Sequence, residues 1–201
     1  MNIVDKRVLK KIKQYGKISQ RQLSEVCGFS LGKVNQSIQF LQKEEYVDEE
    51  WNLTEKSTKL IDLYKPKKAI ILAAGLGMRM VPINTEVPKA LLTVKGETLI
   101  ERLIHQLHEV NVYDITVVVG FMKEEFEFLI DEYKVKLVCN MDYAKKNNLH
   151  SLAKVGSDLI NTYIIPCDIW CETNPFNACE LYSWYMVKNC LLYTSDAADE
   201  L

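Results

Sequence analysis

Long hydrophobic runs and paired cysteines are both missing from the sequence. No stretch of its 201 residues approaches the ~18 uninterrupted apolar residues that a membrane-spanning helix needs, and residues 1–7 lack the apolar stretch of a signal peptide. None of the six cysteines forms a C-x-x-C pair, so neither a zinc site nor a disulfide framework is indicated. These absences argue against membrane insertion and a secreted disulfide-rich class, and they predict a cytoplasmic protein with reduced thiols.

Positive and negative charges are nearly balanced in the sequence. The net charge is −2, which excludes a strongly basic nucleic-acid coat. Residues 1–66 hold 12 Lys and Arg against 9 Asp and Glu, whereas residues 67–189 hold 13 against 15. Near Pro66 the hydrophobic pattern also changes from a helical period to a strand-like run. We therefore predict two domains, one over residues 1–65 and one over residues 67–189.

The last part of the chain, residues 190–201, follows neither a helical nor a strand period. It resembles the peptide that results when a sequencing-library adapter is translated in one frame. We therefore expect a non-native tail and a gene interrupted at about residue 189. The alternative is a genuine short C-terminal tail.

The first domain shows helical patterns and one short hairpin. A first helix ends near Gly16, and the capping box Ser19–Gln22 opens a second helix. A third helix follows, and residues 46–54 indicate a hairpin before a closing helix over residues 55–64. The residues expected to face the core from the second and third helices are Leu23, Val26, Leu31, Val34, Ile38 and Leu41.

This order of helices and hairpin resembles a bacterial winged helix-turn-helix module. The resemblance implies that the third helix enters the DNA major groove, where Asn35, Gln36 and Gln39 would offer amide groups to adenine edges. Lys33 could meet a phosphate. Against DNA binding, the acidic residues 48–50 at the wing tip would repel a phosphate backbone. The alternative is that the module packs against the next domain or binds protein.

The second domain opens with an apolar run that ends abruptly at Gly75, as expected of a buried parallel strand. The following glycines would let backbone N–H groups approach a polyphosphate, and Arg79 adds a cation with a planar donor fork. Lys89, after Pro88, places a second cation before a short apolar stretch. A dinucleotide fingerprint would require glycine where Met80 stands, and the P-loop pattern is absent.

The two-part motif of residues 72–82 and 87–92 resembles the signature of the nucleotidyltransferases that activate sugar-1-phosphates and phosphocholine. The resemblance implies catalytic roles for Arg79 and Lys89. It implies nucleotide binding by one continuous segment: Leu72, Ala73, Ala74, Gly75, Leu76, Gly77, Met78 and Arg79. Because Met78 stands where relatives usually carry serine or threonine, one side-chain contact to phosphate is expected to be lost.

Helical and strand patterns alternate through the rest of this domain. The predicted helices cover residues 97–110, 124–133 and 148–159, and the predicted strands cover residues 115–119, 136–139 and 162–167. This alternation predicts an α/β fold: a small winged-helix domain followed by a truncated, mostly parallel, Rossmann-like nucleotidyltransferase domain. Ligands of such folds bind at the carboxyl ends of the strands, where both Gly75 and Asp168 fall.

Asp168 follows an apolar strand directly. A carboxylate there can hold Mg²⁺ against a nucleotide phosphate, since Mg²⁺ usually takes one or two protein carboxylates plus substrate oxygens. The resemblance assigns Asp168 this role and implies a second metal-binding aspartate on a later strand. Nothing after Asp168 fits that second position, so we expect residues 1–201 alone to be nearly inactive. The alternative for Asp168 is a helix cap or a solvent-facing carboxylate.

The segment Asn140–Leu152 narrows the choice of substrate. Its Asn…Tyr…Asn…Ser-Leu pattern resembles the phosphocholine cytidylyltransferase branch, which implies CTP, with phosphocholine as the phosphorylated acceptor. Asn147 and Ser151 would then lie near the nucleotide or the acceptor; the alternative is that they cap a helix. His105 and His108 have no third ligand in view, and we interpret both as surface residues.

Two rival functions stay open. The first is a sugar-1-phosphate or inositol-phosphate nucleotidyltransferase. The second is a transcription regulator whose α/β domain only senses a nucleotide. Arg79, Lys89 and Asp168 together favour turnover, because a sensor does not need a cation that stabilises a transition state.

Overall fold

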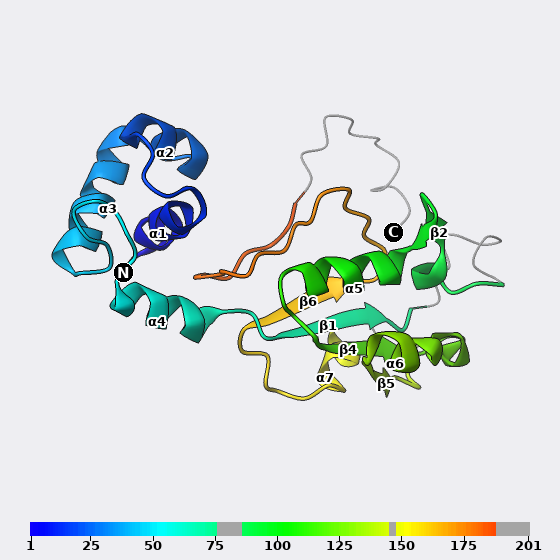
Figure 1. Ribbon diagram of the computed structural model, residues 1–201. Coiled ribbons are helices and arrows are strands. Elements are labelled where there is room, and N and C mark those ends of the chain that lie inside the picture. Colours follow the sequence, from blue (N-terminus) through cyan, green and yellow to red (C-terminus); the bar gives the residue numbers. More distant parts are fainter. Residues whose placement is uncertain (76–85, 145–147, 188–201) are drawn as a thin grey trace, which may run out of the picture.

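The computed structural model describes residues 1–75, 86–144 and 148–187. A group of helices from the first third of the chain lies beside a parallel sheet that carries its own helices (Figure 1). Within the described ranges, no helix combines the length and the apolar character that a membrane crossing requires.

The N-terminal region folds as four helices. Three of them begin with a side-chain capping hydrogen bond, and the third helix along the chain begins after Ser30 without one. The four helices are α1 (Ile3–Tyr15), α2 (Gln20–Cys27), α3 (Leu31–Lys43) and α4 (Glu55–Tyr64). The predicted capping box at Ser19 is present: its hydroxyl accepts from Gln22 N–H, and the Gln22 side chain accepts from Ser19 N–H. The predicted hairpin is reduced to one antiparallel bridge between Val47 and Leu53.

The core of this region is formed by apolar residues from all four helices, joined by two residues from far along the chain. Its buried members include Val8, Leu9, Ile12, Leu23, Val34, Ile38, Leu41 and Ile61, together with Cys179 and Leu181. The inward positions predicted for Val26 and Leu31 are wrong, because these side chains are 39% and 46% exposed. Leu31 is the first residue of α3 and lies at the edge of the packed face.

The C-terminal region contains a four-stranded parallel sheet in the order β5-β4-β1-β6. Its strands are β1 (Lys68–Ala73), β4 (Asp114–Val119), β5 (Lys136–Cys139) and β6 (Thr162–Pro166). The register places Ile71 between Val117 and Ile165. A short antiparallel pair, β2 (Thr93–Val94) and β3 (Glu97–Thr98), lies outside this sheet. The predicted α/β fold with a parallel sheet is confirmed.

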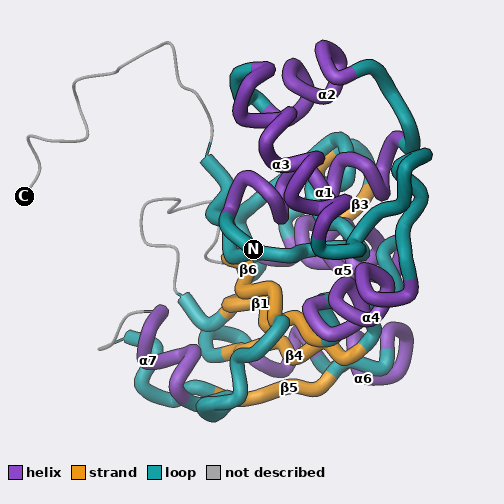
Figure 2. The backbone as a smooth tube through the Cα atoms, turned by 90° about the vertical axis from the view of Figure 1, so that its left-hand side faces the viewer, coloured by secondary structure: helices purple, strands orange, loops and turns teal. Residues whose placement is uncertain are grey.

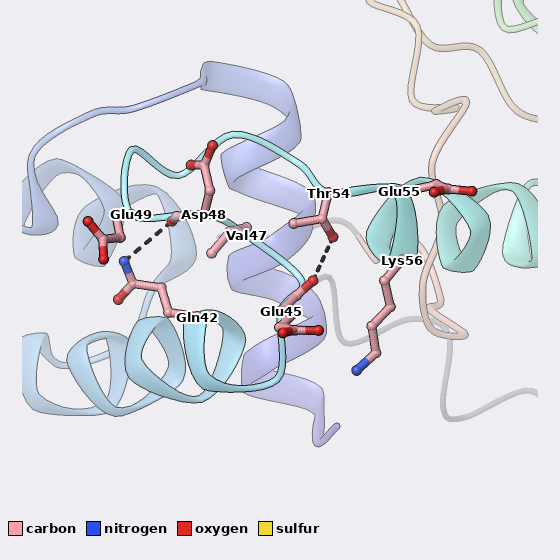
Figure 3. Close-up of a pocket in the computed structure, with 8 residues that line it drawn as sticks. All are labelled: Gln42, Glu45, Val47, Asp48, Glu49, Thr54, Glu55 and Lys56. Carbon is pink, nitrogen blue, oxygen red and sulfur yellow. Dashed lines mark hydrogen bonds between the residues drawn. The ribbon is translucent and has the colours of Figure 1, made fainter.

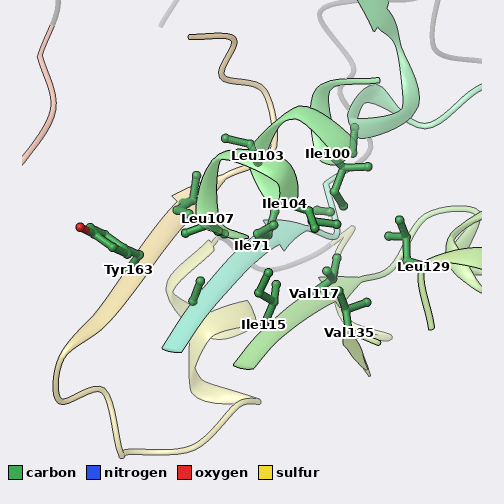
Figure 4. Packing of buried hydrophobic residues seen from close by; sticks show 14 of the residues in the cluster. Ile71, Ile100, Leu103, Ile104, Leu107, Ile115, Val117, Leu129, Val135 and Tyr163 are labelled. Atoms are coloured by element: carbon green, nitrogen blue, oxygen red, sulfur yellow. The ribbon is translucent and has the colours of Figure 1, made fainter. Parts of the chain in front are cut away.

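Helices cover both faces of the sheet because successive strand residues point to opposite sides. On one face, α5 (Leu99–Glu109) packs Leu103, Ile104 and Leu107 against Ile71 and Val117 (Figure 4). The segment of η3 (Lys123–Phe126) and α6 (Phe128–Tyr133) covers the same face. On the other face, Ile70 and Val118 meet Leu152 of α7 (Asn148–Ala153). Figure 2 shows α5 and α6 on one side of the strands and α7 on the other.

Three predicted helices differ in extent from those observed. The helix expected from residue 97 begins at Leu99, because Thr98 caps it in a capping box with Glu101. The helix predicted over residues 124–133 is split into η3 and α6. The helix predicted over residues 148–159 ends at Ala153; just beyond it, Gly156 has φ +109°, a value that L side chains rarely adopt.

After β6 the chain returns to the winged helix through residues 174–182, which we call the strap. Phe176 is buried in the sheet core, whereas Cys179 and Leu181 are buried among the winged-helix residues. Glu180 accepts a hydrogen bond from Lys10 of α1 (2.5 Å), and these side chains are 8% and 14% exposed. The strap therefore joins the two regions by apolar contacts and a largely buried ion pair.

Candidate functional site

The carboxyl ends of β1 and β6 form the place where a ligand is expected. The connection after β1 leads to α5 on one face of the sheet, whereas the connection into β6 comes from α7 on the other face. The strand order β5-β4-β1-β6 therefore reverses between β1 and β6, and ligands of open parallel sheets bind in the crevice outside the carboxyl ends at such a reversal. At this place Cys167 N–H donates to the Leu72 carbonyl (3.2 Å), which joins the chain after β6 to the end of β1.

Lys89 and Asp168 meet at this crevice. Lys89 begins the short 3₁₀ turn η2 (Lys89–Leu91), which is anchored by the buried side chain of Ala90 in the sheet core. Asp168 follows β6, and its Oδ2 lies 2.6 Å from Lys89 Nζ. The two side chains are 28% and 43% exposed, so both can reach a ligand from solvent. The structure therefore brings together the cation and the carboxylate that the sequence placed far apart.

The donor set around Asp168 is compatible with Mg²⁺ held jointly with a nucleotide. Among the described residues, no group of three or more His, Cys, Asp or Glu side chains could hold a metal ion. A Mg²⁺ site built from one or two protein carboxylates and several phosphate oxygens does not need such a group. Asp168 therefore fits a shared site of this kind and does not fit an all-protein metal cage.

The start of the predicted nucleotide-binding segment lies at the end of β1. Leu72 and Ala73 belong to the strand, and Ala74 is 4% exposed and accepts from Phe121 N–H (3.3 Å). Gly75 is exposed at the crevice. The remaining predicted residues of the segment, Leu76, Gly77, Met78 and Arg79, lie outside the described residues, so their nucleotide contacts stay a prediction.

Gly120 is a site residue that sequence reasoning missed. It follows β4, and a Cβ atom built on it would lie 2.8 Å from both the Ala74 carbonyl oxygen and Tyr143 Cδ1. Since real Cβ atoms do not come so close, only glycine lets the end of β4 pass beside the start of the predicted nucleotide-binding segment. Its signal in the sequence is a glycine directly after an apolar strand.

Asn140 organises the loop after β5 from the inside. It is fully buried; its backbone N–H donates to the Val119 carbonyl (2.8 Å), and its Oδ1 accepts from Asp142 N–H (3.0 Å). Its Nδ2 donates to Ser151 Oγ (2.9 Å), and Ser151 is itself 3% exposed. Ser151 thus ties this loop to α7, while its predicted contact with nucleotide or acceptor stays a prediction. Asn147 lies outside the described residues.

The remaining polar candidates near the sheet have local partners. His105 is 47% exposed at its side chain and lies 2.5 Å from a Glu97 carboxylate oxygen. His108 is less exposed than a surface histidine, because its ring lies against that of Tyr113 (centroids 4.9 Å apart) and its Nε2 is buried without a hydrogen-bond partner among the described residues. Burial raises the pKa of the Cys167 thiol to about 12, so this cysteine is neutral at physiological pH.

On the winged helix, α3 presents most of the residues predicted to contact DNA. Lys33, Gln36 and Gln39 are exposed, and α3 lies on the side of the winged helix away from the sheet (Figure 1). Asn35 is partly buried, and its Oδ1 has no hydrogen-bond partner in the described ranges. Three of the four predicted side chains are therefore free to meet a ligand from solvent.

The wing side of this region is acidic. A hollow of about 690 Å³ lies between the end of α3, the wing and the start of α4 (Figure 3). The acidic residues that line it are Glu45, Asp48, Glu49 and Glu55. Hydrogen bonds from Asn52 lower the pKa of Asp48, which therefore stays ionised at neutral pH. This charge disfavours a phosphate backbone at the wing.

These features define a class: an α/β nucleotidyltransferase with a Rossmann-like sheet, preceded by a winged helix-turn-helix. Residues 69–174 match the model of the MobA-like NTP transferase domain, and residues 1–48 match that of the winged helix-turn-helix DNA-binding family. The first match covers more than half of the chain, which therefore belongs to the MobA-like NTP transferase family. Both resemblances predicted from the motifs are confirmed at the level of the family.

Several relatives are cytidylyltransferases. The chain is 46% identical over 109 residues to the choline-phosphate cytidylyltransferase of Streptococcus pneumoniae, covering 54% of this chain and 48% of that protein. It is 47% identical over 85 residues to the 2-aminoethylphosphonate cytidylyltransferase of Lancefieldella rimae, covering 42% of this chain and 35% of that protein.

A solved structure shares the fold of the C-terminal region. This is the CTP:phosphocholine cytidylyltransferase LicC from Streptococcus pneumoniae, with a TM-score of 0.55 and 44% identity over 56% of this chain and 50% of that chain. The chain spans about half the length, or less, of these relatives.

Proposed function

We propose that this chain is part of an enzyme that transfers a cytidylyl group from CTP to a phosphorylated acceptor and releases pyrophosphate. Phosphocholine is the favoured acceptor. The observation that carries the proposal is the meeting of Lys89 and Asp168 at the crevice between β1 and β6. The Asn140–Leu152 pattern and the similarity to cytidylyltransferases support CTP over UTP or dTTP.

In the proposed reaction, a phosphate oxygen of the acceptor attacks the α-phosphorus of CTP in line. A new oxygen–phosphorus bond forms as the bond to the β-phosphate breaks, and pyrophosphate leaves with the displaced electron pair. No covalent intermediate with the protein is required. Catalysis of this kind depends on positioning and on stabilisation of charge.

Each site residue has a separate task in this proposal. Lys89 would stabilise the charge that develops around the α-phosphate, and Arg79 would neutralise the leaving pyrophosphate. Asp168 would hold Mg²⁺, which when bound supplies positive charge to the phosphates. The backbone from Leu72 to Arg79 would bind the triphosphate through its N–H groups.

The ion pair between Lys89 and Asp168 must open when substrates bind. Both side chains are partly exposed, and exposed pairs of this kind contribute only about 0–1 kcal/mol. The triphosphate would offer Lys89 new anionic partners while Asp168 takes its metal. The pair therefore holds both side chains at the crevice without posing a large barrier to binding.

Nucleotide selectivity tests this proposal. Isothermal titration of the purified chain with CTP, UTP, dTTP, ATP and GTP in Mg²⁺ should give the tightest binding for CTP. Pyrophosphate release with phosphocholine, measured in a chain of the relatives' full length, should likewise be fastest with CTP. Preference for UTP or dTTP with a sugar-1-phosphate would support the rival transferase branch.

A second candidate function is DNA contact through α3, which is favoured by the exposure of Lys33, Gln36 and Gln39 on a helix that lies away from the sheet. The net charge of the first 66 residues and the acidic wing limit phosphate neutralisation, so we propose weak, salt-sensitive binding at most. Fluorescence anisotropy of the whole chain with duplex DNA at low and physiological salt tests this. Nanomolar binding to a specific site at physiological salt would support the regulator alternative.

A further inference from the structure

The segment that follows Asp168 is held against α5 by hydrogen bonds from two side chains of that helix. Arg102 donates from Nε to the Cys171 carbonyl (3.3 Å) and from Nη2 to the Glu172 carbonyl (2.5 Å). Gln106, one turn further along α5 and fully buried, donates from Nε2 to the same Cys171 carbonyl (2.8 Å). Consecutive peptide groups of this segment are thereby fixed to a helix that is packed in the sheet core.

The guanidinium of Arg102 suits this task because its donors form a planar fork. One fork can bond two neighbouring carbonyls at once, which the single ammonium of lysine does not reproduce. The guanidinium also lies 5.5 Å from the ring centre of Trp170 and 3.8 Å from a Glu97 carboxylate oxygen. With its side chain only 24% exposed, Arg102 is held from several sides.

Few contacts fix the orientation of the Asp168 side chain. Among the residues that the structure describes, its carboxylate has one hydrogen-bond partner, the partly exposed Lys89, which is expected to turn to phosphate when a nucleotide binds. The carboxylate then depends on its backbone for orientation. That backbone is set on one side by the pairing of β6 with β1, and on the other side by Arg102 and Gln106.

We propose that Arg102 is a positioning residue for the metal-binding carboxylate of Asp168. By holding the peptide groups of Cys171 and Glu172, Arg102 fixes the path of the chain after Asp168 and keeps its carboxylate at the crevice. The inference rests on the proposed function, since it assumes that Asp168 holds the metal. Partners that orient metal ligands without touching the metal typically change metal affinity by about 10–100-fold when they are removed.

The test measures Mn²⁺ binding by electron paramagnetic resonance in the 201-residue chain with CTP present, at a temperature where each variant is folded by circular dichroism. Arg102→Met should weaken Mn²⁺ binding by about 10-fold or more. Arg102→Lys, which keeps the charge but loses the fork, should rescue the affinity only in part and should fold even where Arg102→Met does not. A purely structural role predicts a lower melting temperature with unchanged Mn²⁺ affinity.

Lys95→Met is the matched control. Lys95 also contacts Glu172, but through an exposed side-chain pair (2.6 Å) with exposures of 64% and 78%, so its loss should leave Mn²⁺ affinity unchanged. Parental Mn²⁺ affinity in Arg102→Met, or in Arg102→Lys if Arg102→Met does not fold, would overturn the inference alone. Failure of the parent chain to bind Mn²⁺ with CTP would overturn both the inference and the proposed metal site.

Discussion

The two hydrophobic cores of this chain are completed in different ways. The sheet core is built mainly from strands and helices that follow one another along the chain between β1 and β6. The winged-helix core also contains Cys179 and Leu181, which follow it by more than a hundred residues. The winged-helix region, which the sequence pattern presents as a separate domain, thus depends for its packing on residues from a distant segment.

The junction between the two regions is polar as well as apolar. Lys10 and Glu180 form an ion pair that is mostly shielded from water, and Glu180 Oε1 lies 3.3 Å from the Tyr163 hydroxyl of β6. Burial raises the pKa of Tyr163, which therefore stays protonated and donates to the Asn177 carbonyl (2.9 Å). A charged group of the winged helix is thereby linked, through the strap, to β6 at the edge of the described sheet.

Leu181→Ala should produce the largest effect on this arrangement. Leu181 is 1% exposed in the winged-helix core, and removal of a buried leucine side chain costs about 2–5 kcal/mol. Hydrogen exchange should show lost protection in α1 and α3 with little change in β1 and β4. Ile160→Ala, at a side chain 75% exposed, is the control. Equal loss of protection in both regions would contradict a separately weakened winged helix.

Lys89→Ala, in the sheet region, should lower the rate of the proposed reaction with little change in stability, whereas Leu181→Ala lowers stability. Loss of a group that stabilises transition-state charge lowers turnover by about 10²–10³-fold. Pyrophosphate release in a chain of the relatives' full length would measure this, and thermal unfolding would check the fold. Unchanged kinetics would show that Lys89 is a surface cation without a catalytic role.

The sequence predicts the secondary-structure elements of this molecule better than its tertiary contacts. The four strands were predictable because each is a short apolar run, and β1 could be located by the glycine that follows it. The strap was not, because residues 174–182 carry no period and their packing is decided by tertiary contacts. The end of α7 at Ala153 is not apparent from the sequence, because Leu152, Val155 and Leu159 keep a helical spacing and all pack on the sheet, although a turn at Gly156 separates Leu159 from the other two.

The site shows the same division. The residue types at Lys89 and Asp168 follow from the motif, but their direct pairing across 79 residues does not, since the resemblance gives phosphate as the ligand of Lys89 and Mg²⁺ as the ligand of Asp168. Gly120 and Asn140 act through close approach and buried hydrogen bonds, which a linear pattern does not display. Arg102 lies on a helix whose apolar stripe dominates the pattern, so nothing in the sequence separates it from a solvent-facing cation.

Lys10→Met tests the ion pair at the junction. The change leaves the Glu180 carboxylate mostly buried without its cation, and loss of one partner from a buried hydrogen bond costs about 1–3 kcal/mol, with more expected for a charge. Because Tyr163 and Asn177 still contact Glu180, we expect a value within this range. Urea unfolding of Lys10→Met, Glu180→Leu and the double variant would give the coupling energy. A coupling near zero would show that the pair contributes little to the junction.

Lys89→Ala should also change metal binding, by a smaller amount and in the opposite direction to its effect on turnover. In the proposed site without nucleotide, Lys89 would compete with a metal ion for Asp168, and a partly exposed ion pair is worth at most about 1 kcal/mol. We therefore expect Mn²⁺ alone to bind Lys89→Ala up to about fivefold more tightly than the parent. Weaker binding of Mn²⁺ alone would show that Lys89 does not shield the carboxylate.

The smallest expected effect is a pH dependence confined to the sheet region. Burial lowers the pKa of His108 on α5 below its usual 6.5, so the folded state favours the neutral ring. As the pH falls through about 6.5, the unfolded chain takes up a proton that the folded chain resists, and stability decreases. The pKa of Glu101 is also lowered, through its bond with Thr98, but that group acts only as the pH falls through its usual value of 4.5. Urea unfolding at pH 7.5, 6.5 and 5.5, with hydrogen exchange of α5, should therefore show a loss that His108→Gln reduces, and identical pH slopes in parent and variant would contradict it.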